Sequence, residues 1–135
     1  MLGFIGAGKV GTSLARFFYE YYVHKGLTSL ALSSICSKHL SSANDTISSI
    51  SKLSCNLPDI ALPKVADTLS SLVEKSDIIF VTVTDSVISD IDDKLSKLGR
   101  DALKDKVLVH CSGVLCAEAG FKKCSKLTDT VSLHP

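Results

Sequence analysis

The stretch GFIGAGKVGT, residues 3–12, constrains the fold of this chain more than any other feature. Three glycines, Gly6, Gly8 and Gly11, are spaced as G-x-G-x-x-G between a short apolar run and a segment with apolar residues at helical spacing. A turn of this kind places the unpaired first-turn amides of a helix, with roughly half a positive charge from its dipole, beside the glycines. The stretch therefore predicts either a cradle for a cofactor phosphate or a tight turn that binds nothing.

The position of the motif favours the cradle. It follows an expected strand and opens an expected helix in the first β-α-β unit, as a dinucleotide-binding turn requires. The first glycine permits the tight turn, the second leaves room for a pyrophosphate, and the third lets the helix approach the strand. We expect the following residues to form the cofactor-binding loop: Gly6, Ala7, Gly8, Lys9, Val10 and Gly11. Lys9 would add positive charge, although a solvated lysine explains it equally well.

Strand and helix patterns alternate along the rest of the chain. We expect strands near residues 2–5, 30–36, 61–66, 78–83, 107–111 and 130–133. Helices are expected from residue 10, over 37–53, after an N-cap at Asp67, over 87–98 and over 117–127. The continuous apolar run from Ile78 to Val83 is typical of a central parallel strand. The predicted fold class is α/β, a doubly wound, mainly parallel sheet of about six strands, in one domain over residues 1–135.

Composition excludes several functional classes. The chain has 135 residues, 45% of them hydrophobic, and a net charge of +1 with its charges spread along the sequence. No basic stripe is present for nucleic acid or a membrane surface, and the longest apolar run is far shorter than the about 20 residues that span a bilayer. We therefore expect a small-molecule ligand as the partner, with no nucleic acid and no membrane.

The cysteines indicate a reducing compartment. There are five, with no C-x-x-C pair, which argues against a disulfide framework and against a metal site. Reduced thiols and the absence of a secretory signal predict a cytoplasmic protein.

The end of the second expected strand distinguishes between cofactors. Domains that prefer NAD usually carry an acidic residue about 20 residues beyond the glycines. Residues 34–39 read SICSKH and contain no acid, whereas the Ser37 hydroxyl and the Lys38 ammonium could hold a 2′-phosphate. The sequence thus favours NADP as the cofactor over NAD.

Four stretches in order, GFIGAGKVGTSLA, SDIIFVTVTDSVI, VLVHCSG and VSLHP, resemble one family. They are similar to the N-terminal half of Rossmann-like proteins that carry a C-terminal helical domain of unknown function 2520. That family is related to pyrroline-5-carboxylate reductase, ketopantoate reductase and the β-hydroxyacid dehydrogenases. The resemblance covers essentially the whole chain, and HCSG and SLHP are its most specific parts.

The resemblance implies an NADP-binding domain of an oxidoreductase that transfers a hydride to a small carbonyl or imine substrate. In such proteins the substrate pocket, the proton donor and a homodimer contact come mostly from the C-terminal helical domain, which is absent from this chain. We therefore expect the chain alone to bind a dinucleotide without turning over a substrate. Two alternatives remain: a non-catalytic nucleotide-binding or regulatory module, and a structural protein whose turn binds nothing.

The resemblance also implies roles for residues late in the chain. Val83, Thr84 and Asp85 would lie beside the middle of the cofactor, with Thr84 standing where relatives commonly have proline. Ser112 would lie near the nicotinamide, and His134 would face the same crevice. Ser112 and His134 are the catalytic candidates, since a hydrogen bond from either could orient a carbonyl or imine.

Each of these late residues also has a simpler interpretation. His134 could merely end a strand, and Asp85 could be an N-cap. His110, inside the fifth expected strand, is expected in the core or at an interface.

Overall fold

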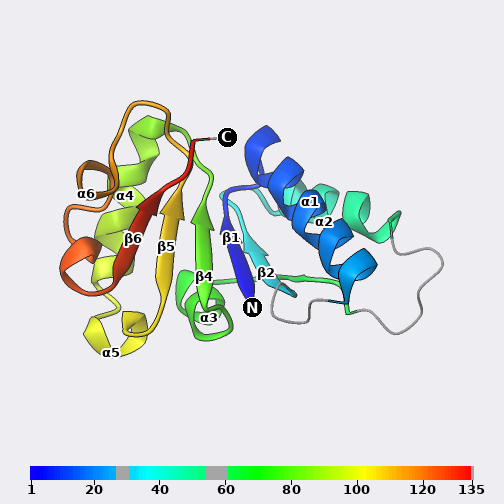
Figure 1. Cartoon of the computed structure of the whole chain (residues 1–135), viewed down its shortest axis with the longest axis horizontal. Helices are drawn as coiled ribbons and strands as arrows, with labels where there is room; N and C mark the ends of the chain where they lie inside the picture. Colours follow the sequence, from blue (N-terminus) through cyan, green and yellow to red (C-terminus); the bar gives the residue numbers. More distant parts are fainter. Residues whose placement is uncertain (27–30, 54–60, 135) are drawn as a thin grey trace.

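A computed structural model of the chain describes residues 1–26, 31–53 and 61–134. All neighbouring strands in its sheet pair in parallel. The strands are β1 (Leu2–Ile5), β2 (Leu32–Cys36), β3 (Lys64–Val65), β4 (Ile78–Val81), β5 (Val107–His110) and β6 (Asp129–Ser132). Their spatial order is β3-β2-β1-β4-β5-β6 (Figure 1), so the predicted doubly wound fold is confirmed. The order reverses between β1 and β4, which makes their carboxyl ends the expected place for a ligand.

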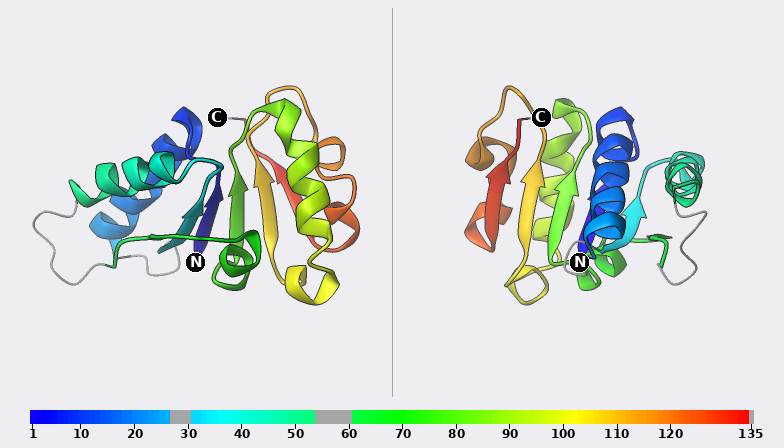
Figure 2. Two further views of the ribbon diagram at one scale, coloured as in Figure 1. Left: turned by 180° about the vertical axis from the view of Figure 1, so that it is seen from behind. Right: turned by 45° about the vertical axis from the view of Figure 1, so that its right-hand side comes forward.

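Helices cover both faces of the sheet (Figure 2). The helical elements are α1 (Lys9–Lys25), α2 (Leu40–Ser51), α3 (Leu69–Glu74), α4 (Asp85–Ser96), α5 (Arg100–Leu103), α6 (Ala117–Gly120) and the 3-10 turn η2 (Cys124–Lys126). α1 and α2 pack on one face, and the elements from α3 onward pack on the other. Two apolar cores result, since each side of the sheet buries its own set of alternating strand residues.

The α1 side of the sheet is covered unevenly. Phe4 pairs with Phe80, Phe80 with Val109 and Val109 with Val131, so these residues form one row across four strands. Exposure along that row rises from 0% at Phe4 to 44% at Val131. Among the described residues no helix lies over β6 on this side (Figures 1 and 2).

An aromatic chain runs along the border of this open face. The ring of Phe80 stacks on Phe4 with 5.0 Å between centroids and lies 5.2 Å from Phe18 of α1. Phe18 in turn contacts Phe17, which is 57% exposed. We define the open face as three exposed apolar side chains on this side of the sheet. They are Phe17 of α1, Val131 of β6, and Leu133 directly after β6.

No helix in the described ranges is both long and apolar enough to cross a membrane.

The structure corrects the sequence predictions at several element ends. The N-cap of α3 is Thr68, whose hydroxyl accepts a hydrogen bond from the Ser71 amide, so the prediction of Asp67 is wrong by one residue. The helix expected over 117–127 is broken into α6 and η2 at Phe121, which has a non-helical φ of −119° and ψ of 62°. The short helix α5 was not predicted.

Strand bounds differ as well, most of all for the strand expected over 61–66, where β3 covers only Lys64–Val65. β4 ends at Val81, two residues before the end of its apolar run. The second strand begins at Leu32, and the expected start at Leu30 lies outside the described residues.

Candidate functional site

Two glycines of the opening motif are required by the packing of the turn itself. A Cβ at Gly6 would lie 2.8 Å from the carbonyl oxygen of Thr82, and a Cβ at Gly11 would lie 2.3 Å from the carbonyl oxygen of Gly6. Gly6 also has a φ of +106°, which side-chain-bearing residues rarely adopt. These two glycines would be needed even if the turn bound nothing.

Gly8 is different, because a Cβ there would meet no atom within 4 Å. It is the N-cap of α1 and makes no side-chain cap, and the first turn of the helix contains no acidic residue. The first-turn amides of this 17-residue helix are therefore uncapped by side chains, beside an open space. This is the local arrangement that binds a phosphate group at a helix N-terminus.

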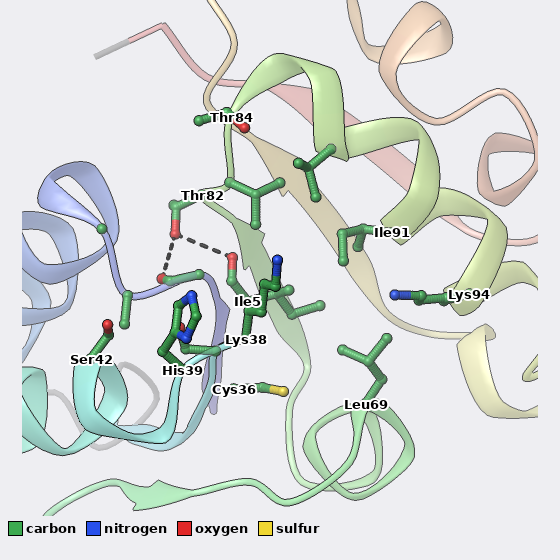
Figure 3. A pocket seen from close by; sticks show the side chains of 16 residues that line it. Ile5, Cys36, Lys38, His39, Ser42, Leu69, Thr82, Thr84, Ile91 and Lys94 are labelled. Atoms are coloured by element: carbon green, nitrogen blue, oxygen red, sulfur yellow. Dashed lines mark hydrogen bonds between the residues drawn. The ribbon is translucent and has the colours of Figure 1, made fainter.

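One side chain fixes the turn against the neighbouring strand. The buried Thr82 hydroxyl donates a 2.8 Å hydrogen bond to the Gly6 carbonyl oxygen and lies 3.3 Å from that of Ile5 (Figure 3). The Thr82 amide donates to the same Ile5 oxygen at 2.8 Å. The position of the glycine turn is thus coupled to the carboxyl end of β4.

A pocket of about 580 Å³ opens beside this turn. Its lining comes from residues 5–8 of the glycine turn, the end of β2 with the start of α2, Leu69 of α3, residues 82–84 after β4, and the side of α4. The volume lies within the range of small-molecule and cofactor sites. The pocket lies at the predicted carboxyl edge of the sheet, between β1, β2 and β4.

The walls of the pocket divide into an apolar part and a polar part. Leu69, Val83, Val87 and Ile91 provide apolar surface from α3, the segment after β4, and α4. Ser37, Lys38, His39 and Ser42 line the polar end after β2 (Figure 3). An apolar slot beside hydroxyl and ammonium groups suits a flat ring that carries a charged substituent.

The charge of the lining has one sign. Lys38 and Lys94 line the pocket, and none of the described residues in the lining is a carboxylate. Burial raises the pKa of the Cys36 thiol, and the charge of Asp67 raises this pKa further. Cys36 is therefore a neutral thiol that does not offset the lysines.

The structure brings together most of the predicted cofactor-binding residues. Those that line the pocket are Gly6, Ala7, Gly8, Ser37, Lys38, Val83 and Thr84. Those outside its lining are Lys9, Val10, Gly11, Asp85 and Ser112. Lys9, Val10 and Gly11 form the first turn of α1, while Asp85 opens α4 directly after its N-cap, Thr84. The alternative interpretation of Asp85 as an N-cap is thus wrong by one residue.

Ser112 has a structural role beyond the end of β5. Its side-chain oxygen accepts hydrogen bonds from the amides of Val114, at 3.2 Å, and Leu115, at 3.1 Å, and the residue is 4% exposed. Its own amide donates to Nδ1 of His110, whose Nε2 lies 3.2 Å from the Cys116 carbonyl oxygen. These contacts fit a neutral His110 that donates from Nε2. The expectation that His110 lies in the core is confirmed by its full burial.

His134 lies against the same loop. A Cβ at Gly113 would fall 2.7 Å from Nε2 of His134, so the imidazole ring occupies the space that this glycine leaves. His134 is exposed and does not line the pocket. The two catalytic candidates, Ser112 and His134, therefore flank Gly113 beside the ends of β5 and β6, outside the pocket lining.

Several pocket residues were missed from the sequence. They are Ile5, Cys36, His39, Ser42, Leu69, Thr82, Val87, Ile91 and Lys94. For three of them a signal existed, because positions 87, 91 and 94 recur at helical spacing and share one face of α4. That face could be assigned to the pocket only once the strand order was known.

Within the described ranges, no group of three or more His, Cys, Asp or Glu side chains is placed to hold a metal ion. Cys36, Cys111, Cys116 and Cys124 are free thiols, and Cys55 lies outside the described residues.

The family model described as NADP oxidoreductase, coenzyme F420-dependent, matches residues 1–113 of the chain. The chain belongs to this family of NADP oxidoreductases. The match contains the glycine turn and every described residue of the pocket lining. The prediction of an NADP oxidoreductase domain is therefore confirmed at the level of the family.

Solved structures share the fold of this NADP oxidoreductase domain. An imine reductase from Myxococcus stipitatus in complex with NADP+ is 21% identical, with a TM-score of 0.61 over 98% of this chain and 39% of its own. A malate dehydrogenase from Picrophilus torridus is 15% identical, with a TM-score of 0.73 over 98% of this chain and 45% of its own. An imine reductase from Bacillus cereus BAG3X2 is 16% identical, with a TM-score of 0.65 over 97% of this chain and 38% of its own. The chain thus spans less than half the length of these structures, and no curated protein matches it.

Proposed function

We propose that this chain is the NADP-binding domain of an oxidoreductase that reduces a small carbonyl or imine compound. The observation that carries the proposal is Gly8, the one glycine of the motif whose missing side chain serves neither the turn nor the helix crossing. An open N-cap beside a pocket with apolar walls and two lysines fits a dinucleotide with an additional phosphate. The family supports NADP as that dinucleotide.

In this proposal each part of the pocket has a separate task. The first-turn amides of α1 bind the pyrophosphate over Gly8, and Thr82 keeps this turn in place. The apolar slot formed by Val83, Val87 and Ile91 holds the adenine ring. Ser37 and Lys38 bind the 2′-phosphate, since a charged hydrogen bond contributes roughly 1.5–3 kcal/mol.

When bound, the reduced nicotinamide supplies the hydride. The residues of this chain orient the cofactor and leave the acceptor side open toward β5 and β6. Asp85, Ser112 and His134 are proposed to lie near that end, on the resemblance described above. The hydroxyl of Ser112 or the imidazole of His134 would orient the acceptor.

The open face supports a second part of the proposal, a further helical domain. Phe17, Val131 and Leu133 are exposed apolar side chains of the kind that packing elsewhere in the fold buries. We propose that a C-terminal helical domain, of the kind implied by the resemblance to the family with domain of unknown function 2520, covers this face. That domain would also complete the substrate pocket and form the homodimer.

A non-catalytic nucleotide-binding module remains the second candidate. It is favoured by the engagement of Ser112, whose oxygen already accepts two backbone hydrogen bonds, and by the absence of both catalytic candidates from the pocket lining. In either case we place the protein in the cytoplasm, which agrees with its free thiols.

Titration of the chain with NADP+, NADPH, NAD+ and NADH tests the proposal. We expect NADP+ to bind at least ten times more tightly than NAD+, and Lys38→Ala to remove most of that preference. Lys97→Ala, at the C-cap of α4 and outside the pocket, is the matched control and should change neither affinity. Equal affinities for NADP+ in wild type and Lys38→Ala would remove Lys38 from the site, and no binding of any dinucleotide would refute the proposal.

Turnover separates the domain from a complete enzyme. We expect the chain with NADPH to reduce neither an imine nor a 2-keto acid, nor coenzyme F420, which the family description names. Appreciable NADPH oxidation with any of these acceptors would show that the chain needs no further domain.

A further inference from the structure

We propose that Lys94 of α4 is a specificity-determining residue, which binds the 2′-phosphate of the adenosine from the wall opposite Lys38. This inference rests on the proposed function and adds a residue that neither the sequence motifs nor the resemblance assigns. It concerns the charge balance between the pocket and a 2′-phosphate. Lys38, the cation from the segment after β2, would balance only part of the negative charge of that phosphate.

The first argument is the position of Lys94. It follows Ile91 by three residues and Val87 by seven, so it continues the face of α4 that forms the apolar wall. Figure 3 shows its ammonium group pointing into the pocket from α4, while the ammonium group of Lys38 points into the pocket from the end of β2. The two cations come from different elements and approach one space.

The second argument is the lack of a competing carboxylate. Neither Lys38 nor Lys94 forms an ion pair with any described residue, whereas Lys104 and Lys123 pair with Asp101 and Asp93. Asp90 lies four residues before Lys94, the spacing at which helix ion pairs form, yet no such pair is made among the described residues. The Lys94 side chain extends along the pocket instead.

The third argument is the charge of the ligand. A phosphate monoester carries about two negative charges at pH 7.5, because its second pKa is near 6. Two lysines on facing walls match that charge, and the described lining has no carboxylate to oppose them. A dinucleotide without the 2′-phosphate would leave the two ammonium groups facing each other without an anion, which disfavours it.

The fourth argument concerns the third basic side chain at this end. His39 also lines the pocket. It is present in every variant of the test below, so differences between the variants come from the lysines. Asp67, the carboxylate that acts on Cys36, lies outside the lining and reduces this field without removing it.

The test compares Lys94→Gln with Lys97→Gln by isothermal titration at pH 8 and low ionic strength. Both substitutions remove one positive charge, from the last turn of α4 or from its C-cap, but only Lys94 lines the pocket. The probes are NADP+ and adenosine 2′,5′-bisphosphate, which carry the 2′-phosphate, and NAD+ and 5′-AMP, which lack it. Thermal unfolding of each variant provides the check on folding.

We expect Lys94→Gln to weaken both 2′-phosphate ligands about three- to ten-fold and to change NAD+ and 5′-AMP by less than two-fold. Lys94→Arg should restore most of the preference, and added salt should reduce the difference between wild type and Lys94→Gln. Equal NADP+/NAD+ ratios in the two glutamine variants would overturn the role of Lys94 and leave dinucleotide binding intact. If wild type binds none of the four probes, the proposed function and this inference both fall.

Discussion

The two ends of the carboxyl edge of the sheet differ in how their polar groups are used. At the pocket, the first-turn amides of α1 have no side-chain cap and the two lysines have no described ion pair. At the β5–β6 corner, which we define as His110, Ser112, Gly113 and His134, the described hydrogen bonds connect the loop to itself. The pocket is thus prepared for an external anion, whereas the described contacts of the corner serve its own conformation.

On the proposed function, this difference would let the domain bind its cofactor before a substrate site is complete. Backbone amides and a glycine turn are fixed by the fold, so the phosphate cradle needs no further chain. The corner has a buried imidazole and a turn-capping hydroxyl, neither of which lines the pocket. A catalytic role there would require a ligand or another domain to compete with existing hydrogen bonds.

The largest expected effect comes from the glycine turn. Gly8→Ala places a methyl group in open space at an ordinary backbone conformation, so the unfolding temperature should change little. The same methyl group would occupy the position proposed for the pyrophosphate. We expect the affinity for NADP+ to fall about ten-fold to a hundred-fold, as measured by calorimetric titration.

Gly11→Ala is the matched comparison within the same motif. Its Cβ would lie 2.3 Å from the Gly6 carbonyl oxygen and 2.5 Å from Oγ1 of Thr82, so we expect a loss of stability of about 1–3 kcal/mol. If Gly8→Ala lost stability but kept its NADP+ affinity, the assignment of Gly8 to the ligand would be wrong.

An intermediate effect is expected at the corner. Ser112→Ala removes the acceptor of the Val114 and Leu115 amides, which should lower the free energy of unfolding by about 1–2 kcal/mol. NADP+ affinity should stay within two-fold of wild type, and Ser86→Ala, an exposed serine on α4, should change neither quantity. If Ser112→Ala kept its full stability but lost affinity for NADP+, the sequence-based prediction that Ser112 binds the cofactor would be supported. The contrast between the pocket and the β5–β6 corner would then be weaker.

The smallest expected effect concerns the ion pair between Asp93 of α4 and Lys123, the N-cap of η2. Asp93 lies 2.8 Å from the Lys123 ammonium, and that hydrogen bond lowers the pKa of Asp93 and raises the pKa of Lys123. The depressed carboxyl pKa stabilises the fold above the ordinary value of 3.8, and this contribution is lost as the pH falls through the lowered pKa. Raising the pH through the elevated lysine pKa, above 10.5, removes the contribution again.

Unfolding temperatures of wild type and Asp93→Asn from pH 2 to pH 8 measure this pair. We expect a small advantage of wild type at pH 7 that disappears in acid, with nucleotide affinity unchanged. Asp101→Asn is the control, because its 3.7 Å pair with Lys104 involves a fully exposed carboxylate. A constant difference between wild type and Asp93→Asn down to pH 2 would contradict the ion-pair explanation.

The sequence predicted the fold because its periodic signals are local. Apolar runs and helical spacing gave the alternation of strands and helices, and the glycine spacing placed the nucleotide-binding turn directly after the first strand. Failures occurred where a contact distant in sequence decided a local conformation. The break between α6 and η2 is an example, since the buried Asp92 of α4 accepts hydrogen bonds from the amides of Lys123 and Cys124 at 2.9 Å.

The candidate site was predicted in part for the same reason. Residues adjacent to the glycines or at the ends of β2 and β4 could be assigned from their place in the chain. Lys94 could not, because its relevance depends on which face of α4 lines the pocket, and this is set by tertiary packing. The sequence showed that Ser112 places a hydroxyl after β5. The two backbone hydrogen bonds that this hydroxyl accepts form only in the folded loop, so the sequence could not show them.

The open face formed by Phe17, Val131 and Leu133 has a thermodynamic consequence. Any segment or molecule that binds this surface in the folded state, and not in the unfolded one, shifts the folding equilibrium by mass action. The melting temperature of the domain then reports whether this face is occupied. Cofactor and covering segment would each raise it, and an increase beyond the sum of their separate contributions would reveal communication between them.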